Sequence, residues 1–342
     1  MRLGKQRNES KYMAVQYFYT KRGWSISWMC KRLKISRAAY YKWLHREVPA
    51  QELENIEIAE LIKEYDDRFN HILGYRRMTL VINTLNHKYH SKKRIHRIMQ
   101  KLKIKSVLRK KKRKYPKSDP DKVAENVLKR NFFADAPNQK WVTDVTEIKI
   151  PNSDEKLYLS LILDLYDRYP VSYVVQKRNN NHLVIKTFEK AVAQYPDAKP
   201  ILHSDRGFQY TSKIFHAKLE EQHMTQSMSR VGCCIDNGPM EGLWSIIKTE
   251  MFALYEIEDE GSLRAAIDKY MYFYSHERFQ ERYKGKTPYQ VRSEAFESDI
   301  PTPYPIPVNP RIEKYKAKWS VKNIVTTKTA QDGSQQQKEA CQ

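Results

Sequence analysis

Between residues 140 and 229 the sequence changes its periodicity several times, and this order of segments restricts the fold more than any other feature. Three β-rich runs come first, separated by short turns: KWVTDVTEIKI, KLYLSLILDLYD and YPVSYVVQKR. A helix, a short strand, a second helix and another short strand follow, at residues 181–195, 199–205, 212–222 and 225–229. This order predicts an α/β fold, with a mixed five-stranded sheet flanked by helices.

A further helix begins within SRVGCCIDNGPMEGLWSIIKTE, residues 229–250. Its apolar residues recur at helical spacing on one side: Met240, Leu243, Trp244, Ile247 and Met251. Glu241, Ser245 and Lys248 share one edge beside that side, because seven residues nearly complete two turns. We expect the apolar side to be buried and the edge with Glu241 to face a site beside the sheet.

The charge of the chain predicts a polyanionic partner. Sixty-two Lys and Arg residues against 40 Asp and Glu give a net charge of +22, which attracts nucleic acid through counterion release. A ribosome-associated or membrane-surface protein is the alternative, but the mean hydropathy is −0.77 and no long apolar run exists. The N-terminus, MRLGKQRNES, lacks the apolar segment of a signal peptide, so we expect a cytoplasmic protein. The four cysteines have no disulfide or zinc spacing and are expected to be reduced.

Two helical blocks precede the sheet pattern. Residues 12–46 contain helices broken at Lys34 and restarted by an expected N-cap at Ser36, a helix-turn-helix pattern that turns Arg37 and Lys42 outward. A small helical bundle with ordinary solvated charges is the other interpretation. Residues 54–104 form the second block, in which a helix starting at Ser91 presents Lys92, Lys93 and Arg94.

Ten Lys or Arg residues lie within positions 101–117, KLKIKSVLRKKKRKYPK. Such a run repels itself and favours an extended path along phosphates, although it is also compatible with a solvated segment or a localisation tag. The sequence therefore predicts five regions: a helix-turn-helix module (1–50), a second helical module (51–108), a basic linker (109–136), a catalytic core (137–298) and a flexible tail (299–342).

Three carboxylates stand out in the core. Asp144 lies inside the first strand, and Asp205 directly follows the strand PILHS, where active sites of helix-covered sheets collect. Glu241 stands in the first turn of a helix, where its ordinary role would be to interact with the helix dipole. Taken together in so basic a chain, the three form a good site for a hard cation. Two Mg²⁺ ions about 4 Å apart can clamp both oxygens of a phosphoryl transfer.

Two weaker candidates lie nearby. Asp164, at the end of LILD, is either an assisting metal ligand or an ordinary acid at the end of a strand. His203 and Ser204 flank Asp205, but no Gly-x-Ser-x-Gly elbow accompanies them, so a serine hydrolase is not expected.

These residues carry a family resemblance. WVTDVTEI, HSDRGFQYTS and the helix with Glu241 resemble the Asp, Asp and Glu motifs of integrase-core transposases from bacterial insertion sequences, in the IS-three family. Residues 206–240 separate Asp205 from Glu241, which is the 35-residue spacing that this family shares with retroviral integrases. ILGYRRMTL, residues 72–80, resembles the family's Gly-Tyr-Arg-Arg motif, and YSHERFQERYKGKTPYQVR resembles its usual core ending.

The resemblance implies a ribonuclease-H-like core with catalytic and metal-binding Asp144, Asp205 and Glu241, Mg²⁺ or Mn²⁺ as cofactor, and cleavage and joining of element ends through a circular intermediate. The chain is similar to the B-frame product, so an A-frame protein or fusion is an expected partner. The expected nucleic-acid partner is double-stranded DNA, both at the terminal inverted repeats and at the target. The resemblance also implies homo-oligomers on DNA and association with the bacterial nucleoid. Expected DNA contacts are Lys248, Arg76, Arg77, Lys92, Lys93, Arg94, Arg37, Lys42, Arg109, Lys110, Lys111, Lys112 and Arg113. The competing interpretations are a repressor or decayed remnant that only binds DNA, and a nuclease without strand transfer.

Overall fold

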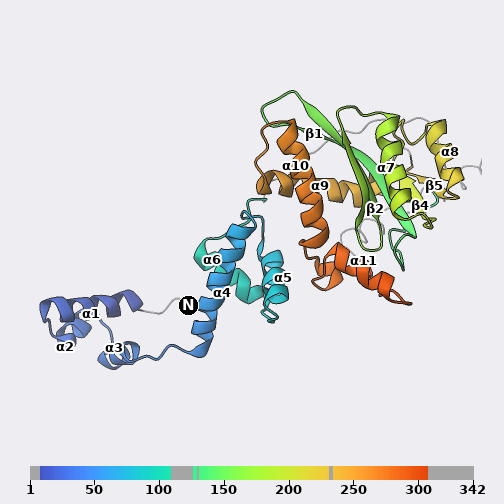
Figure 1. Cartoon of the computed structure of the whole chain (residues 1–342). Coiled ribbons are helices and arrows are strands. Elements are labelled where there is room, and N and C mark those ends of the chain that lie inside the picture. Colours follow the sequence, from blue (N-terminus) through green and yellow to red (C-terminus); the bar gives the residue numbers. More distant parts are fainter. Residues whose placement is uncertain (1–7, 109–125, 129–130, 231–233, 307–342) are drawn as a thin grey trace, which may run out of the picture.

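The computed structural model describes residues 8–108, 126–128, 131–230 and 234–306. In Figure 1 the N-terminal helices lie apart from the sheet, and the helices of the second block stand between them and the core. The predicted basic residues 109–113 and the tail beyond residue 306 fall outside the described residues. No helix in the described part of the chain is both long and apolar enough to cross a membrane.

The sheet has the five strands that the sequence predicts. They are β1 (Lys140–Lys149), β2 (Lys156–Asp164), β3 (Pro170–Gln176), β4 (Ile201–Ser204) and β5 (Thr225–Met228). Their order across the sheet is β3-β2-β1-β4-β5. The meander β1 to β3 is antiparallel, whereas β4 lies parallel to β1 and β5 parallel to β4. The predicted mixed, helix-flanked sheet is confirmed.

Successive side chains of each strand point to opposite faces of the sheet, and both faces are buried. On β1, Trp141 packs with helices α7 (Asn181–Gln194) and α8 (Lys213–Glu221). Val142 points to the other face, which is covered by α9 (Gly238–Leu254) and α10 (Glu260–His276). Asp144, two residues after Val142, therefore belongs to the face that α9 covers.

The N-terminal helices are α1 (Glu9–Arg22), α2 (Ile26–Arg32) and α3 (Arg37–Leu44). They share a small core of their own, whose buried members are Tyr12, Val15, Met29, Cys30 and Tyr40. The expected N-cap is present, because the Ser36 hydroxyl accepts a hydrogen bond from the Ala39 amide. This cluster holds the helix-turn-helix pattern together separately from the sheet.

The second helical block consists of α4 (Ala50–Arg68), α5 (Tyr75–Leu85) and α6 (Lys92–Leu102). Ser91 caps α6 as expected, with its hydroxyl accepting from the Arg94 amide. The apolar side of these helices belongs to the same buried cluster as α9, α10 and the sheet. This block therefore packs on the catalytic core as a continuous structure.

One helix at the end of the core was not predicted. Helix α11 (Pro288–Glu297) begins with a capping box, in which Thr287 and Gln290 exchange hydrogen bonds between side chain and backbone. Pro288 stands at the first helical position, where a missing N–H costs nothing. The helix packs beside Tyr166 and Tyr283 in a third buried cluster.

Candidate active site

Strand pairing places Asp144 and Asp205 side by side. Thr143 on β1 is paired in register with Ser204 on the parallel strand β4, and each aspartate is the next residue of its chain. Neighbouring strands lie about 4.8 Å apart, so the two carboxylates project from adjacent positions of the sheet. The sequence predicts that Asp205 lies at the C-terminal end of a strand, and the parallel pairing shows that Asp144 lies beside it.

A short, tightly held segment leads into α9 and Glu241. A 3₁₀ turn, Cys234–Asn237, precedes the helix. The side-chain amide of Asn237 donates a hydrogen bond to the Thr143 carbonyl on β1 at 3.4 Å. Asp236 is buried and accepts two hydrogen bonds from the Arg230 guanidinium, at 2.9 and 3.1 Å. These contacts fix the start of α9 beside β1, so Glu241 in the first turn is delivered to the side of the sheet that carries Asp144.

The buried face of α9 is as predicted, and one of its members has a second role. Met240, Leu243, Ile247 and Met251 are nearly inaccessible to solvent. Trp244 is also buried, and its indole Nε1–H donates to Asp144 Oδ2 at 2.9 Å. A buried indole N–H normally finds an acceptor, which is the only sequence signal that could have indicated this contact.

Asp205 is held by its own turn. The Gly207 amide donates to Asp205 Oδ1 at 2.9 Å. A methyl group on Gly207 would lie 3.1 Å from Asp205 Oδ1 and 2.8 Å from Gln209 Oε1, so the turn leaves little room for any side chain there. Glycine at this position allows the backbone to approach the carboxylate closely.

The three carboxylates interact electrostatically. Burial, together with the negative charges of Asp205 and Glu241, raises the pKa of Asp144 to about 7 against the opposing hydrogen bonds from Trp244 and Val145. Burial also raises the pKa of Asp205. Anionic oxygens gathered at one place are stabilised by a bound cation, and oxygen-only donors match the preference of Mg²⁺. The residues therefore fit a divalent hard cation.

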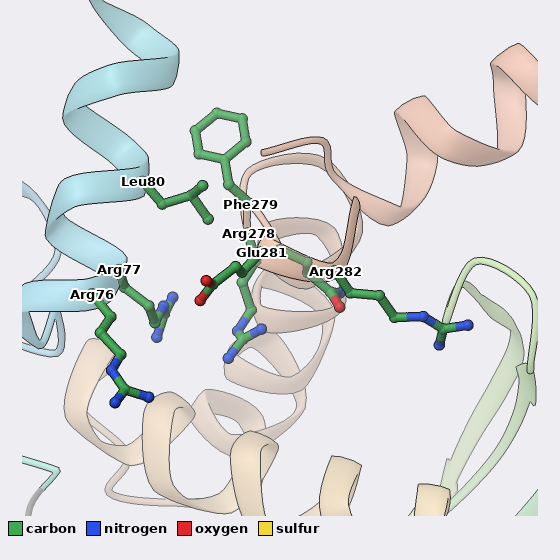
Figure 2. Close-up of a pocket in the computed structure, with 8 residues that line it drawn as sticks. Arg76, Arg77, Leu80, Arg278, Phe279, Glu281 and Arg282 are labelled. Atoms are coloured by element: carbon green, nitrogen blue, oxygen red, sulfur yellow. The ribbon is translucent and has the colours of Figure 1, made fainter. Parts of the chain in front are cut away.

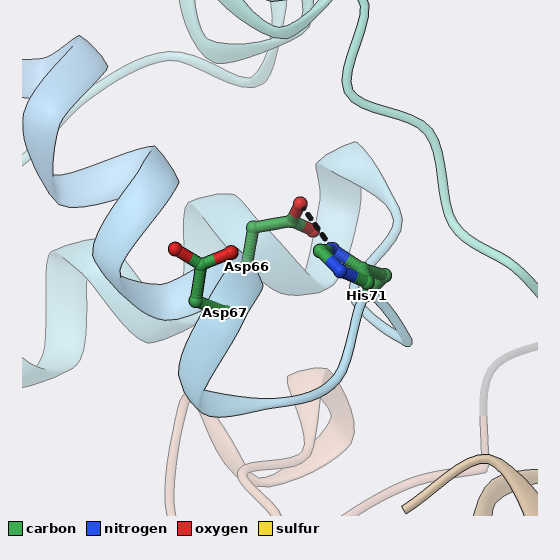
Figure 3. Close-up of side chains that lie close together, drawn as sticks. All are labelled: Asp66, Asp67 and His71. Carbon is green, nitrogen blue, oxygen red and sulfur yellow. Dashed lines mark hydrogen bonds and ion pairs between the residues drawn. The ribbon is translucent and has the colours of Figure 1, made fainter.

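The carboxylate oxygens of Asp144, Asp205 and Glu241 do not all lie within 4.8 Å of one another. Among the described residues, the set of three potential ligands with donor atoms all within 4.8 Å of one another is Asp66, Asp67 and His71, at the end of α4 (Figure 3). Asp66 Oδ2 and His71 Nδ1 are 2.7 Å apart, and this hydrogen bond raises the pKa of His71. The neighbouring Asp66 carboxylate thus favours the protonated form of His71 at the helix C-terminus, where negative charge is otherwise unfavourable.

Lys248 lies close enough to the predicted centre to interact with it. Its ammonium group is half-buried, and this burial lowers its pKa, while the charges of Glu147 and Asp144 act in the opposite direction. Glu241 itself is exposed, on the same edge of α9. The interaction of Lys248 with Asp144 is consistent with the predicted position of this lysine beside the acidic site.

The other expected DNA contacts divide into two groups. Arg37, Lys42, Arg76, Lys92 and Lys93 are exposed, although Lys92 also donates to Glu281. Arg77 and Arg94 instead face protein carboxylates: Arg77 donates to Glu250 at 2.7 Å, and Arg94 donates to Glu54 at 2.8 Å. Both arginines are therefore paired with protein carboxylates, and their contact with DNA stays a prediction.

Asp164 proves to be structural. It is fully buried, and its Oδ2 accepts from the Asn138 amide at 2.6 Å and from Arg292 at 3.2 Å. His203 is buried between the hydroxyls of Ser227 and Ser229, and burial lowers its pKa to about 4. Neither side chain is arranged for catalysis, which agrees with the ordinary interpretation of each.

Two family models match the chain. The Integrase core domain matches residues 134–234, and the HTH-like domain matches residues 52–112. Together with the mixed five-stranded sheet, these matches define the class of protein: an integrase-core polynucleotidyl transferase of the type that uses Asp, Asp and Glu, preceded by a helical DNA-binding domain.

Relatives then give the family. The chain is 32% identical over 275 residues to InsK, named as a transposase for insertion sequence element IS150 of Escherichia coli K12, covering 78% of this chain and 93% of the relative. It is 26% identical over 261 residues to the transposase InsF for insertion sequence IS3A of the same organism, covering 72% and 86%. The chain belongs to the IS-three family of insertion-sequence transposases, as the motifs predicted.

A solved structure is similar to part of the core. The catalytic core domain of HTLV-2 integrase in complex with magnesium covers 46% of this chain and 97% of that chain, at 23% identity and a TM-score of 0.36. The assignment of the fold rests on the family models and on the sheet topology described above.

Proposed function

We propose that Asp144, Asp205 and Glu241 are the catalytic residues of this transposase. The observation that carries the proposal is the convergence of three carboxylates from separate elements. Asp144 and Asp205 follow paired residues of parallel strands, and α9, which carries Glu241, is bonded to Asp144 through Trp244. Each carboxylate taken alone is an ordinary acid, whereas the three together beside β1 and the C-terminal end of β4 form a site for phosphodiester chemistry.

The three carboxylates would hold Mg²⁺ or Mn²⁺, in two ions. Bound there, the cations would polarise the scissile phosphate and activate a water or a 3′-hydroxyl. The protein's own groups keep the site in shape. Trp244 fixes the orientation of Asp144, and the Gly207 amide fixes that of Asp205, so that both enter the reaction already oriented.

The reaction requires no covalent enzyme intermediate. Water attacks phosphorus at the element end and the bond to the 3′ oxygen breaks, which leaves a free 3′-hydroxyl. That hydroxyl then attacks a phosphodiester of the target and displaces the target's 3′ oxygen. Each step exchanges one phosphorus–oxygen bond for another, so strand transfer needs no external energy source.

DNA and protein partners follow from the same proposal. The helical modules would bind the terminal inverted repeats, and the basic linker would follow flanking DNA of the nucleoid. Chains would assemble as homo-oligomers on DNA, with an A-frame protein or fusion as a further partner, and the route would pass through a circular intermediate. The net charge of +22 supports the DNA contacts.

Divalent cations test the catalytic part of the proposal. Purified protein is mixed with a labelled duplex that carries the element's own terminal repeat. We expect nicking and joining with Mg²⁺ or Mn²⁺, and loss of both products on chelation while the DNA complex survives. A protein that binds the repeat but never nicks it with either cation would support the binding-only alternative. Nicking without joining would support a nuclease.

Lys248→Ala tests the proposed contact with terminal DNA. Because a charged hydrogen bond contributes about 1.5 to 3 kcal/mol, end joining should fall by about 10-fold or more, whereas affinity for unrelated DNA changes little. Lys213→Ala, at an exposed lysine on α8, is the matched control and should leave joining unchanged. An equal loss of affinity on every DNA sequence would reduce Lys248 to a general phosphate contact.

A further inference from the structure

A single buried carboxylate joins the DNA-binding helices to the catalytic helix. Glu250 lies on α9 and is only 3% exposed. Its Oε1 accepts from Arg77 on α5 at 2.7 Å and from Arg278, which follows α10, at 2.9 Å. Its Oε2 accepts from Arg278 at 2.9 Å and from the Tyr270 hydroxyl on α10 at 3.0 Å. One side chain thus connects α5, α9 and α10.

Figure 2 shows how the two arginines meet. Arg77 extends from α5 and Arg278 from the core segment opposite. Both side chains line one cavity of about 200 Å³. The side chains of Arg77 and Glu250 are 25% and 5% exposed. A paired charge in such a place contributes geometric specificity rather than net stability, because its desolvation cost offsets much of the attraction.

Further contacts around Glu250 join the second helical block to the core. Phe69, the residue after α4, packs with its ring centroid 6.1 Å from that of Phe273 on α10. The Asn70 side chain donates to the Leu254 carbonyl at 3.0 Å, at the C-terminal end of α9. Gly285 lies so close to α5 that a methyl group would stand 2.8 Å from Thr84 Oγ1. The helical block and α9 therefore share one packed junction.

The same block presents exposed cations to a neighbouring groove, and Arg76 lines both this groove and the cavity that Arg77 lines. Arg76, next to Arg77 in sequence, is exposed and lines a groove of about 870 Å³ together with Lys88, Lys93 and Lys284. Duplex DNA held by this surface would be attached to α9 through Glu250. Glu250 lies nine positions after Glu241, which corresponds to about 13 Å along the helix axis. The junction thus lies at a fixed distance from the predicted catalytic glutamate.

We propose that Arg77 and Glu250 are positioning residues that keep terminal DNA, bound on the helical block, in register with the catalytic centre. Neither residue touches the DNA or the reacting atoms in this scheme. Their pairing determines which phosphodiester reaches Glu241, whereas Arg76 and its neighbours determine how tightly the DNA binds. The inference rests on the proposed function, because register has a meaning only if this site cuts DNA.

The test compares two adjacent arginines. Full-length Arg77→Met and Arg76→Met are each incubated with an end-labelled duplex of the terminal repeat, with affinity measured without catalytic cation and cut positions mapped to the nucleotide. For Arg77→Met we expect wild-type affinity, cleavage slower by up to about 100-fold, and cuts spread over neighbouring phosphates, because a small misplacement has a large effect on rate. For Arg76→Met we expect weaker binding, a salt slope reduced by about 1, and a single unchanged cut position.

Arg77→Lys guards against a folding defect in the first variant. It keeps a charge for Glu250 but cannot form the same planar contact, so we expect intermediate scatter of the cuts with a wild-type melting curve. A single unchanged cut position in both Arg77 variants overturns the inference, and so does an affinity loss in them equal to that of Arg76→Met. If the wild-type protein itself makes no cuts, the proposed function fails instead, and the two failures are distinguishable.

Discussion

Asp144→Asn is expected to reduce cleavage and strand transfer by about 10³-fold or more while DNA binding stays within a few-fold of wild type. A bound cation supplies several kcal/mol of transition-state stabilisation, and each 1.4 kcal/mol corresponds to a factor of ten in rate. The substitution removes a charged ligand but keeps an acceptor for the Trp244 indole, so α9 should remain in place. Asp205→Asn and Glu241→Gln should have effects of the same size.

The measurement is product formation on a labelled terminal-repeat duplex, with affinity and melting temperature recorded for each variant. Asp197→Asn is the matched control, since Asp197 is exposed in the turn after α7 and should leave cleavage within about twofold of wild type. Strand transfer that persists in any of the three carboxylate variants, with DNA binding intact, would show that the assignment of that residue is wrong.

Local patterns were sufficient to predict the five strands of the core and its helices from α7 to α10. The strands of the meander and α9 have strong periodicity, and the apolar face of α9 was predicted residue by residue. Asp205 was found because it follows a short strand at the end where sites collect. These predictions depend on neighbours in sequence, which a pattern can reveal.

Contacts between distant segments were beyond such patterns. Trp244 and Asp144 lie 100 residues apart, and Arg77 and Glu250 lie 173 apart. Arg77 therefore resembled a DNA-binding residue, since an arginine in a basic chain has no local sign of its partner. Its burial depends on how α5 packs against α9, which is a property of the tertiary structure rather than of the local sequence.

Helix α11 was missed for a different reason. Its sequence is short and weakly amphipathic, so no periodic signal stands out, yet Thr287, Pro288 and Gln290 form a recognisable start. The capping box and the proline at the first position together predict a helix N-terminus. These residues lie within the stretch that resembles the family's core ending, and the local signal for a helix start is present there.

Arg292→Met is expected to destabilise the core by about 3 to 5 kcal/mol, the largest effect on stability that we predict. Arg292, on α11, is 3% exposed and donates to Asp167 at 2.7 Å and to Asp164 at 3.2 Å. Its guanidinium also donates to the Tyr195 hydroxyl at 2.8 Å. Methionine fills a similar volume but leaves two carboxylates buried without their cation.

Urea unfolding of the full chain measures this change. Lys286→Met is the matched control, since Lys286 forms its ion pair with Glu294 at a partly exposed site, where a pair contributes less than about 1 kcal/mol. If Arg292→Met were no more destabilising than Lys286→Met, the buried cluster would not hold α11 to the sheet.

The pH dependence separates a charge effect from a loss of packing in Arg292→Met. Burial and the charge of Asp164 together raise the pKa of Asp167 to about 7, although Arg292 opposes this rise. A carboxyl whose pKa is higher in the folded state than in the unfolded chain binds its proton more readily when folded, so acidification favours folding. Without Arg292 this pKa rises further, and the deficit against wild type should therefore be largest near about pH 8.5 and shrink toward about pH 5. A cavity or a lost ring contact has no such dependence, so a deficit that stays constant over this range would assign the effect to packing around Tyr195 and Phe296 instead.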